Sequence, residues 1–329
     1  MAQHARSAVS ADQTSAVPTN VHDTQGERED FSDIIGLIAP YDTPCYSTFR
    51  KVDAVAPVIH WQQDELAAAV ANAVKEGADV ASFDSSTPGI NLNYTQLLEK
   101  TAQVSSTAEA TEWYGRASEM DYQVMKRGRE LKRDIEFAFV GAAQAKAAGA
   151  GGSPPATARQ LGGCEDLIHA DHLNDEATTI LDEAGVLDLH QEIYEAGGDP
   201  NWLLVSPFAA TVVANFAYVD PTTGTASRQR DMEAGNRLVN IVEIYQGPFG
   251  TLTVVTDKFV KGAAAAAAAA DGTAFLLETD RWAIPVLQPM QVEDLSKTGH
   301  NEKKLISCEL SLLHENDKAS GAITGHSTA

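Results

Sequence analysis

The chain has 329 residues, and its 46 Asp and Glu against 24 Lys and Arg give a formal net charge of −22. A surface this acidic repels phosphate backbones and argues against sequence-specific binding of nucleic acid. The cysteines Cys45, Cys164 and Cys308 are too far apart for a disulfide framework or a Cys-x-x-Cys metal site. No apolar run approaches the roughly 20 residues of a membrane span, so no membrane partner is expected.

The acidity has two explanations. One is an ordinary acidic protein, and the other is adaptation to molar salt, where the Debye length falls to about 3 Å and carboxylates no longer repel one another over long distances. Scarce lysine with abundant alanine and aspartate favours the second, halophilic explanation.

The first 30 residues contain almost no large apolar side chain and predict a flexible arm. A short apolar turn follows. Pro40 ends this turn, because the residue before a proline disfavours helix. The run Asp42-Thr43-Pro44 predicts a second turn directly after it. The apolar residues of the first turn are Ile34, Ile35, Leu37 and Ile38.

Residues 55–62 and 89–107 alternate apolar and polar side chains, which predicts two strands. The polar, alanine-rich segment 64–88 separates them. We therefore expect an extended β-hairpin that cannot bury its own tip, and that either lies on another molecule or projects into solvent.

Residues 113–146 contain no proline and repeat apolar residues every three or four positions, which predicts one long helix. About 30 helical residues would span about 45 Å, enough to form a spine. A flexible break is expected at 148–163. The later expectations are helices at 178–196 and 207–216 and strands at 202–205, 239–245, 251–259, 274–277, 282–288 and 303–315.

Residues 164–172 are the one candidate for metal chemistry, because they hold a thiol, two imidazoles and three carboxylates. Zinc sites usually draw ligands from separated places, so an acidic surface loop is the favoured interpretation. Phosphate-binding glycine loops and nucleophile elbows are absent from the sequence. We expect no enzyme, catalytic residue, cofactor or metal, and keep a zinc hydrolase centred on His169 and His172 as a remote alternative.

An arm, a protruding hairpin, a long helix and a β-rich return are poor parts for a monomer, but they suit a subunit that is covered by neighbouring copies. The sequence around IAPYDTP in residues 30–49 resembles the segment that opens many major capsid proteins of tailed phages and tailed archaeal viruses. Further blocks are similar to one such family and collinear with it: WQQDEL, NAVKEGAD, RASEMDYQ, RELKRDIE and SKTGHNEKKLISCELSLLHENDKASGAITG.

The resemblance implies an α+β chain with the Hong Kong 97 fold, which has an N-terminal arm, an extended loop, a peripheral domain with a spine helix, and an axial domain. It also implies a virion shell protein, assembled in the host cytoplasm, that forms the hexamers and pentamers of an icosahedral head around double-stranded DNA. Portal, scaffolding or decoration proteins are possible partners, and an encapsulin-like compartment is the alternative. The implied divisions are 1–50 (arm), 51–110 (loop), 111–177 (spine helix and connection), 178–270 (axial domain) and 271–329 (β-rich return to the peripheral domain).

We hypothesise that the apolar turn and its two prolines anchor the arm at subunit contacts, the alternative being that the turn only caps its own core. Lys75 and Glu76 are expected at such contacts through the loop tip. Some capsid proteins of this fold join a Lys to an Asn with a Glu as base. We expect no crosslink here, because adjacent side chains point apart and the sequence identifies no partner Asn.

Overall fold

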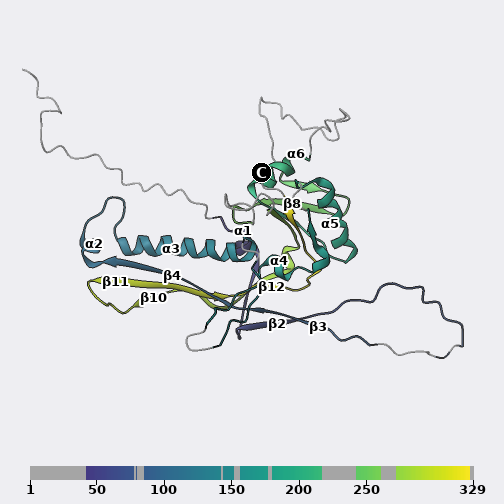
Figure 1. Ribbon diagram of the computed structural model, residues 1–329, viewed down its shortest axis with the longest axis horizontal. Helices are drawn as coiled ribbons and strands as arrows, with labels where there is room; N and C mark the ends of the chain where they lie inside the picture. Colours follow the sequence, from purple (N-terminus) through teal and green to yellow (C-terminus); the bar gives the residue numbers. More distant parts are fainter. Residues whose placement is uncertain are drawn as a thin grey trace, which may run out of the picture.

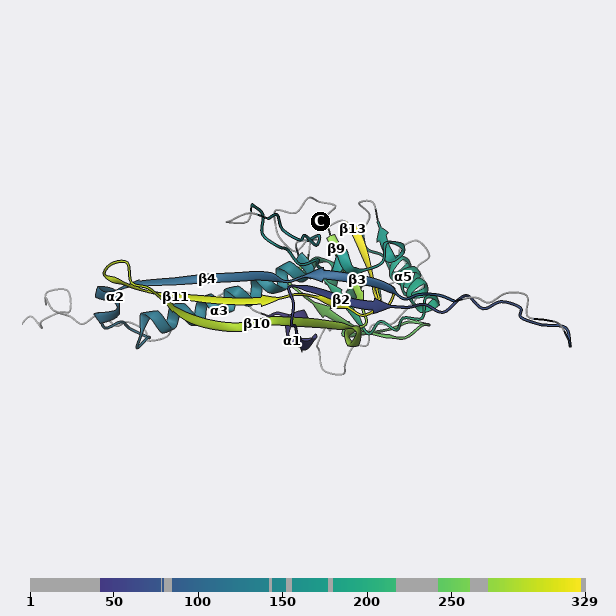
Figure 2. The same ribbon diagram turned by 90° about the horizontal axis from the view of Figure 1, so that it is seen from below.

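The computed structural model describes residues 42–77, 79, 85–141, 144–151, 156–176, 180–216, 242–260 and 272–326. Figure 1 shows a long helix lying along one sheet, a second sheet with its own helices beside it, and a two-stranded ribbon that leads away from both. The view turned by 90° shows that the molecule is thin and elongated (Figure 2). Within the described ranges no helix is long and apolar enough to cross a membrane.

The first sheet has the order β1-β10-β11-β4, and β12 also pairs with β10. Strand β1 is parallel to β10, and the other pairs are antiparallel. Strand β4 pairs along its whole length with β11, from Gln96 opposite Leu310 to Ser105 opposite Asn301. The strands are β1 (Arg50–Asp53), β4 (Gln96–Ser105), β10 (Trp282–Leu295), β11 (Asn301–Leu310) and β12 (Leu313–His314).

Helix α3, Glu119–Glu136, packs on this sheet through Met120, Leu131 and Ile135. It is shorter than the helix predicted for 113–146, and that prediction is wrong at both ends. The Ser118 hydroxyl accepts the N–H of Asp121 at 3.1 Å and caps the helix, after a turn that contains Gly115 at φ +74°. At the other end the α-helix passes into a single π-helical turn, η2 (Phe137–Gly141).

The second sheet has the order β5-β13-β9-β6-β8-β7, with α5 and α6 packed on its core. Its strands are β5 (Leu173–Asp175), β6 (Trp202–Val205), β7 (Ile244–Gln246), β8 (Thr251–Thr256), β9 (Gly272–Leu277) and β13 (Gly321–His326). Helix α5 is Glu183–Glu195 and α6 is Pro207–Asn215. Helix α5 begins later than predicted because the Asp182 side chain caps it by accepting the N–H of Gly185 at 2.7 Å.

Two strands of this second sheet come from the segment 271–329, which the sequence assigned as a whole to the peripheral domain. All six residues of β9 are buried, and β9 lies between β6 and β13. The segment 271–329 therefore contributes strands to both sheets, and the expected division into domains stays a prediction. The other short helices in the described ranges are α1 (Pro44–Thr48), α2 (Ser106–Ala110), α4 (Cys164–Leu167), η3 (Ala170–His172) and η4 (Thr279–Arg281).

Trp282 belongs to the larger core cluster and is completely buried. Its ring stacks on His314 at 4.0 Å and on Phe49 at 5.7 Å between ring centroids. Its Nε1–H donates to the Ser320 hydroxyl at 3.1 Å, so the one polar atom of the side chain is satisfied. This cluster also includes Phe275 and thereby joins the two sheets into one core.

Candidate assembly sites

The two-stranded ribbon consists of β2 (Val58–Gln63) and β3 (Gly89–Tyr94), which pair antiparallel. The hairpin expected here is present, although β4 leaves it and joins the first sheet. Gln63, the last residue of β2, ties the end of the ribbon from which the loop leaves to the body: its Oε1 accepts from Asn91 at 2.7 Å, and its Nε2 donates to Asn316 Oδ1 at 3.1 Å. The end of the ribbon next to the loop is therefore held against the body of the molecule.

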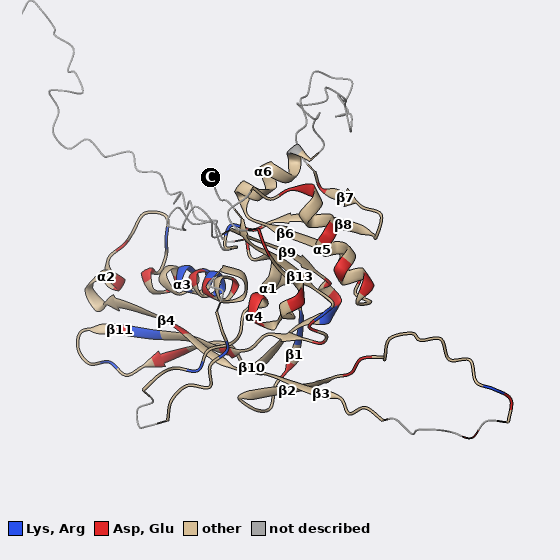
Figure 3. Cartoon of the chain, turned by 45° about the vertical axis from the view of Figure 1, so that its right-hand side comes forward, with Lys and Arg blue, Asp and Glu red and all other residues tan. Residues whose placement is uncertain are grey.

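The segment beyond β2, residues 64–77, is neither helix nor strand and is exposed throughout. Three large apolar side chains lie along it. Leu66 is 99% exposed, Val70 77% and Val74 73%. In Figure 3 this loop stands clear of both sheets. The described part of the subunit therefore does not cover the three apolar side chains of the loop.

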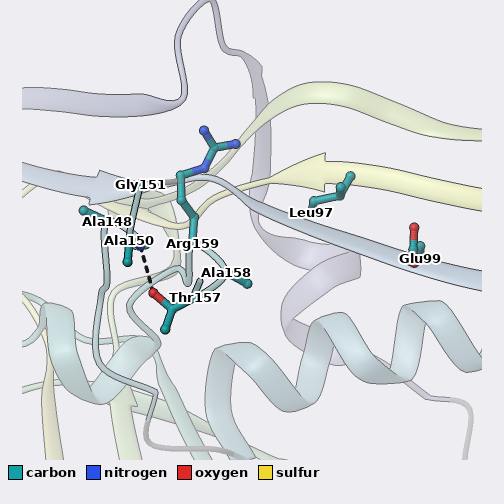
Figure 4. A pocket seen from close by; sticks show the side chains of 9 residues that line it. Leu97, Glu99, Ala148, Ala150, Gly151, Thr157, Ala158 and Arg159 are labelled. Carbon is teal, nitrogen blue, oxygen red and sulfur yellow. Dashed lines mark hydrogen bonds between the residues drawn. The ribbon is translucent and has the colours of Figure 1, made fainter. Parts of the chain in front are cut away.

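A groove of about 620 Å³ lies beside β4 (Figure 4). One wall holds Leu97 and Glu99, and the other is formed by residues 148–151 and 157–159. The N–H of Ala150 donates to the Thr157 hydroxyl at 2.8 Å, which ties these two segments together. Because the second wall consists mainly of Ala and Gly, the groove is open and largely lined by methyl groups and backbone.

Helix α1, Pro44–Thr48, lies at the end of α3, and we call α1 together with Glu136 the arm anchor. The Glu136 carboxylate accepts the N–H of Cys45 at 2.7 Å and the N–H of Tyr46 at 2.9 Å. These are two of the N–H groups that a helix N-terminus leaves without a partner. A side chain 91 residues away in sequence therefore caps α1.

Glu136 is completely buried, and burial raises the pKa of its carboxyl to about 7, although the two N–H donors act in the opposite direction. Burial also raises the pKa of Asp257, whose charge contributes to the shift at Glu136, to about 6. The thiols of Cys45 and Cys164 have a pKa well above the ordinary value for the same reason. Buried thiols with such pKa values are unreactive.

Sequence analysis did not identify Glu136 as a structural residue. The only signal in the sequence was one acid directly before the apolar run Phe137–Val140. An acid in such a position needs a partner when it is buried, and here the partner is the start of α1.

The predicted contact residues are placed as follows. Pro44 is the first residue of α1, a position that suits proline because its missing N–H would have no partner there. Lys75 and Glu76 are exposed in the loop. The five others, Ile34, Ile35, Leu37, Ile38 and Pro40, lie outside the described residues, and the contacts of all eight with other subunits stay a prediction.

The segment 164–172 does not form a zinc site in the structure. Cys164 is completely buried in the core. His169 is partly exposed, and its Nδ1 lies 3.4 Å from Oδ2 of Asp171. The rings of His169 and His172 are 6.4 Å apart. In the described residues no three His, Cys, Asp or Glu side chains are grouped so that they could hold a metal ion.

The family model described as "SU10 major capsid protein" matches residues 17–327. The chain belongs to this family. The major capsid protein of Escherichia phage Phieco32 is 26% identical over 348 residues, which cover 92% of this chain and 95% of that protein. The expected identity as a major capsid protein, located in the virion shell, is therefore confirmed, and the family is structural rather than enzymatic.

Solved structures show the same fold. A chain of Mycobacterium phage Bobi has a TM-score of 0.60 at 13% identity, covering 91% of this chain and 95% of its own. The SrpI encapsulin of Synechococcus elongatus has a TM-score of 0.55 at 9% identity, covering 90% of this chain and 94% of its own. The expected Hong Kong 97 fold is confirmed.

Proposed function

We propose that this major capsid protein forms the hexamers and pentamers of an icosahedral head around double-stranded DNA. The observation that carries the proposal is the loop segment 64–77, whose large apolar side chains are exposed in the single subunit. Such surface is normally covered in an assembly. The groove beside β4 offers an open apolar surface of the kind a neighbouring chain can cover.

A solved capsid with fivefold symmetry supports the proposal that the chain forms pentamers. The capsid of a native GTA particle, solved with C5 symmetry, has a TM-score of 0.60 to this chain at 13% identity, covering 92% of this chain and 96% of its own. In our proposal the five-stranded sheet with α3 is the peripheral domain, α3 serves as the spine helix, and the six-stranded sheet is the axial domain. Portal, scaffolding and decoration proteins are proposed partners of the complete head.

Electron microscopy of the purified chain tests this proposal. We expect closed shells with hexamers and pentamers at molar salt. Only monomers or dimers under every salt condition would contradict it. Boiled shells should release a single band at the 35.0 kDa of the monomer, because we propose no covalent link through Lys75.

The second candidate is an encapsulin-like compartment, which the similarity to the SrpI encapsulin favours. The family match and the relative from Escherichia phage Phieco32 favour the virus head. Shells isolated from the native source separate the two candidates. Packaged double-stranded DNA supports the virus head, and an enclosed protein cargo without DNA supports the compartment.

We further propose that the shell is adapted to high salt. Each copy carries a formal net charge of −22, and the DNA inside the shell is also negatively charged. Repulsion between neighbouring copies reaches about 10 Å at 0.1 M salt but only about 3 Å at 1 M. Shells should remain intact in molar salt and loosen on dilution, measured by light scattering with divalent cations chelated. Heads that stay whole at about 0.1 M would contradict this adaptation.

A further inference from the structure

The loop segment 64–77 has a helical pattern although it is not helical in the single subunit. Leu66, Val70 and Val74 recur at every fourth residue. On a helix with 3.6 residues per turn these positions span only about 80° of the circumference. The polar side chains Asn72 and Lys75 would then lie on the opposite side, which makes the helix amphipathic.

The composition and the ends of the segment favour the same conformation. Alanine, the residue with the highest helix propensity, occupies 67–69, 71 and 73. Asp64 and Glu65 stand where a helix N-terminus favours acids, and Lys75 stands near the C-terminal end, where a cation is favourable. Gly77 already has φ +80°, the left-handed conformation of residues that end helices.

We propose that residues 65–76 fold into an amphipathic α-helix when the loop docks on a second copy of this chain. The inference rests on the proposed function, because the partner is a neighbouring subunit of the shell. A helix of about 12 residues is marginal in water without tertiary packing, which agrees with its absence from the single subunit. Docking supplies the missing apolar contact.

A second copy is the occupant for two reasons. The loop leads away from its own body in both ribbon views (Figures 1 and 2), so its own sheets do not cover the apolar stripe. In a shell, the neighbouring copy is held at a fixed distance, and this raises the effective concentration at which the segment meets its partner. The ordering of the segment then coincides with assembly.

The alternative is that the segment docks as an extended strand. In a strand, alternate residues share a face, so Ala68 and Asn72 would lie with Leu66, Val70 and Val74. In a helix, Ala73 lies beside Leu66, two turns along, and Ala68 lies on the opposite side. Ala68 and Ala73 therefore exchange faces between the two conformations, and both are exposed in the single subunit.

The substitutions Ala73→Lys and Ala68→Lys make a matched pair with the same change of size and charge. Burying an unpaired ammonium is unfavourable, so Ala73→Lys should reduce the yield of shells by about tenfold or more. Ala68→Lys should leave the yield within about twofold of the wild type, because its side chain stays in solvent. Circular dichroism of the dissociated subunits checks that both variants fold normally.

Any other pattern of shell yields from these two variants contradicts the proposed helix. Loss with Ala68→Lys but not with Ala73→Lys indicates a docked strand, and equal effects of the two changes indicate no defined face. These results leave the shell itself intact and concern the helix alone. A wild-type chain that forms no particles contradicts the proposed function, and the helix inference then falls with it.

Hydrogen exchange on shells assembled from the purified chain provides a second measurement. A helix protects consecutive amides from about residue 69 onward, because each N–H bonds four residues back. A strand at an edge protects alternate amides. Protection that appears only after a decoration or scaffolding protein is added would overturn the second copy as the occupant.

Discussion

The extended loop and the arm anchor differ in how far their apolar side chains are exposed to solvent. In the anchor region Cys45 and Ile135 are completely buried within one chain, whereas Leu66 in the loop is 99% exposed. Burial of a large apolar side chain contributes about 1.5–3 kcal/mol. The anchor obtains this stabilisation when the subunit folds, and the loop obtains it only when subunits meet. The two regions should therefore respond differently to substitution.

Replacement of Leu66, Val70 and Val74 together by serine should have the largest effect, and only on assembly. Burial of the three side chains is worth about 4.5–9 kcal/mol per loop, so shells should not form. The free energy of unfolding of the subunit should stay within about 0.5 kcal/mol of the wild type, because the side chains are exposed there. Light scattering and urea unfolding measure the two quantities.

The control for this triple variant is Val55→Ser, which removes a side chain that is 97% exposed and lies outside residues 64–77. It should assemble normally. Normal shells from the triple variant would show that the loop stripe has no role in assembly.

The core substitution Trp282→Ala should act on the subunit itself. It removes the ring stacked between His314 and Phe49 and should lower the free energy of unfolding by about 3–5 kcal/mol. Trp113→Ala, at a residue that is 43% exposed, is the matched control and should lower it by about 1 kcal/mol or less. Equal losses in urea unfolding would contradict the larger contribution of the buried Trp282 to the core.

The arm anchor should make stability depend on pH through Glu136. Its pKa is raised from 4.5 to about 7 in the folded chain, so between these values the folded state keeps a proton that the unfolded state has released. The stabilisation is complete below pH 4.5 and is lost as the pH rises through about 7.

Relative to Glu136→Gln, the wild type should lose at most about 1.4 kcal/mol per pH unit across this window. Urea unfolding at several pH values measures the difference. Asp257 is present in both proteins, so its own titration contributes to both profiles, and the difference reports Glu136 together with its coupling to Asp257. Parallel pH profiles would contradict the raised pKa.

The smallest effect is expected at the root of the loop. Lys318 Nζ lies 2.8 Å from Glu65 Oε1, and both side chains are partly exposed. Lys318→Met should change the free energy of unfolding by less than about 1 kcal/mol, and by less again in molar salt. A loss above about 2 kcal/mol in thermal unfolding would show that this pair, rather than Gln63, holds the ribbon against the body.

The sequence by itself determined several local elements. The strand Trp202–Val205 and the helix that begins at Pro207 have the ends that were predicted, apart from one residue. In both, a local signal is decisive: an apolar run bounded by polar residues, and a proline after the capping Ser206. The hairpin was also predictable, because its alternation and its polar tip lie within about 50 residues of one another. The family blocks supplied the fold.

Only the tertiary structure decided which strands share a sheet and where the long helix ends. The apolar run of β9 shows that the strand is buried, but not that β6 and β13 are its neighbours. The predicted long helix extends beyond α3 because the spacing of apolar residues indicates which face is buried. It does not indicate the Ser118 cap or the π-helical turn at which α3 ends. Glu136 is the clearest example: its role arises only when folding brings α1 to the end of α3. Pairing between distant segments depends on packing in space, which the local pattern of side chains does not specify.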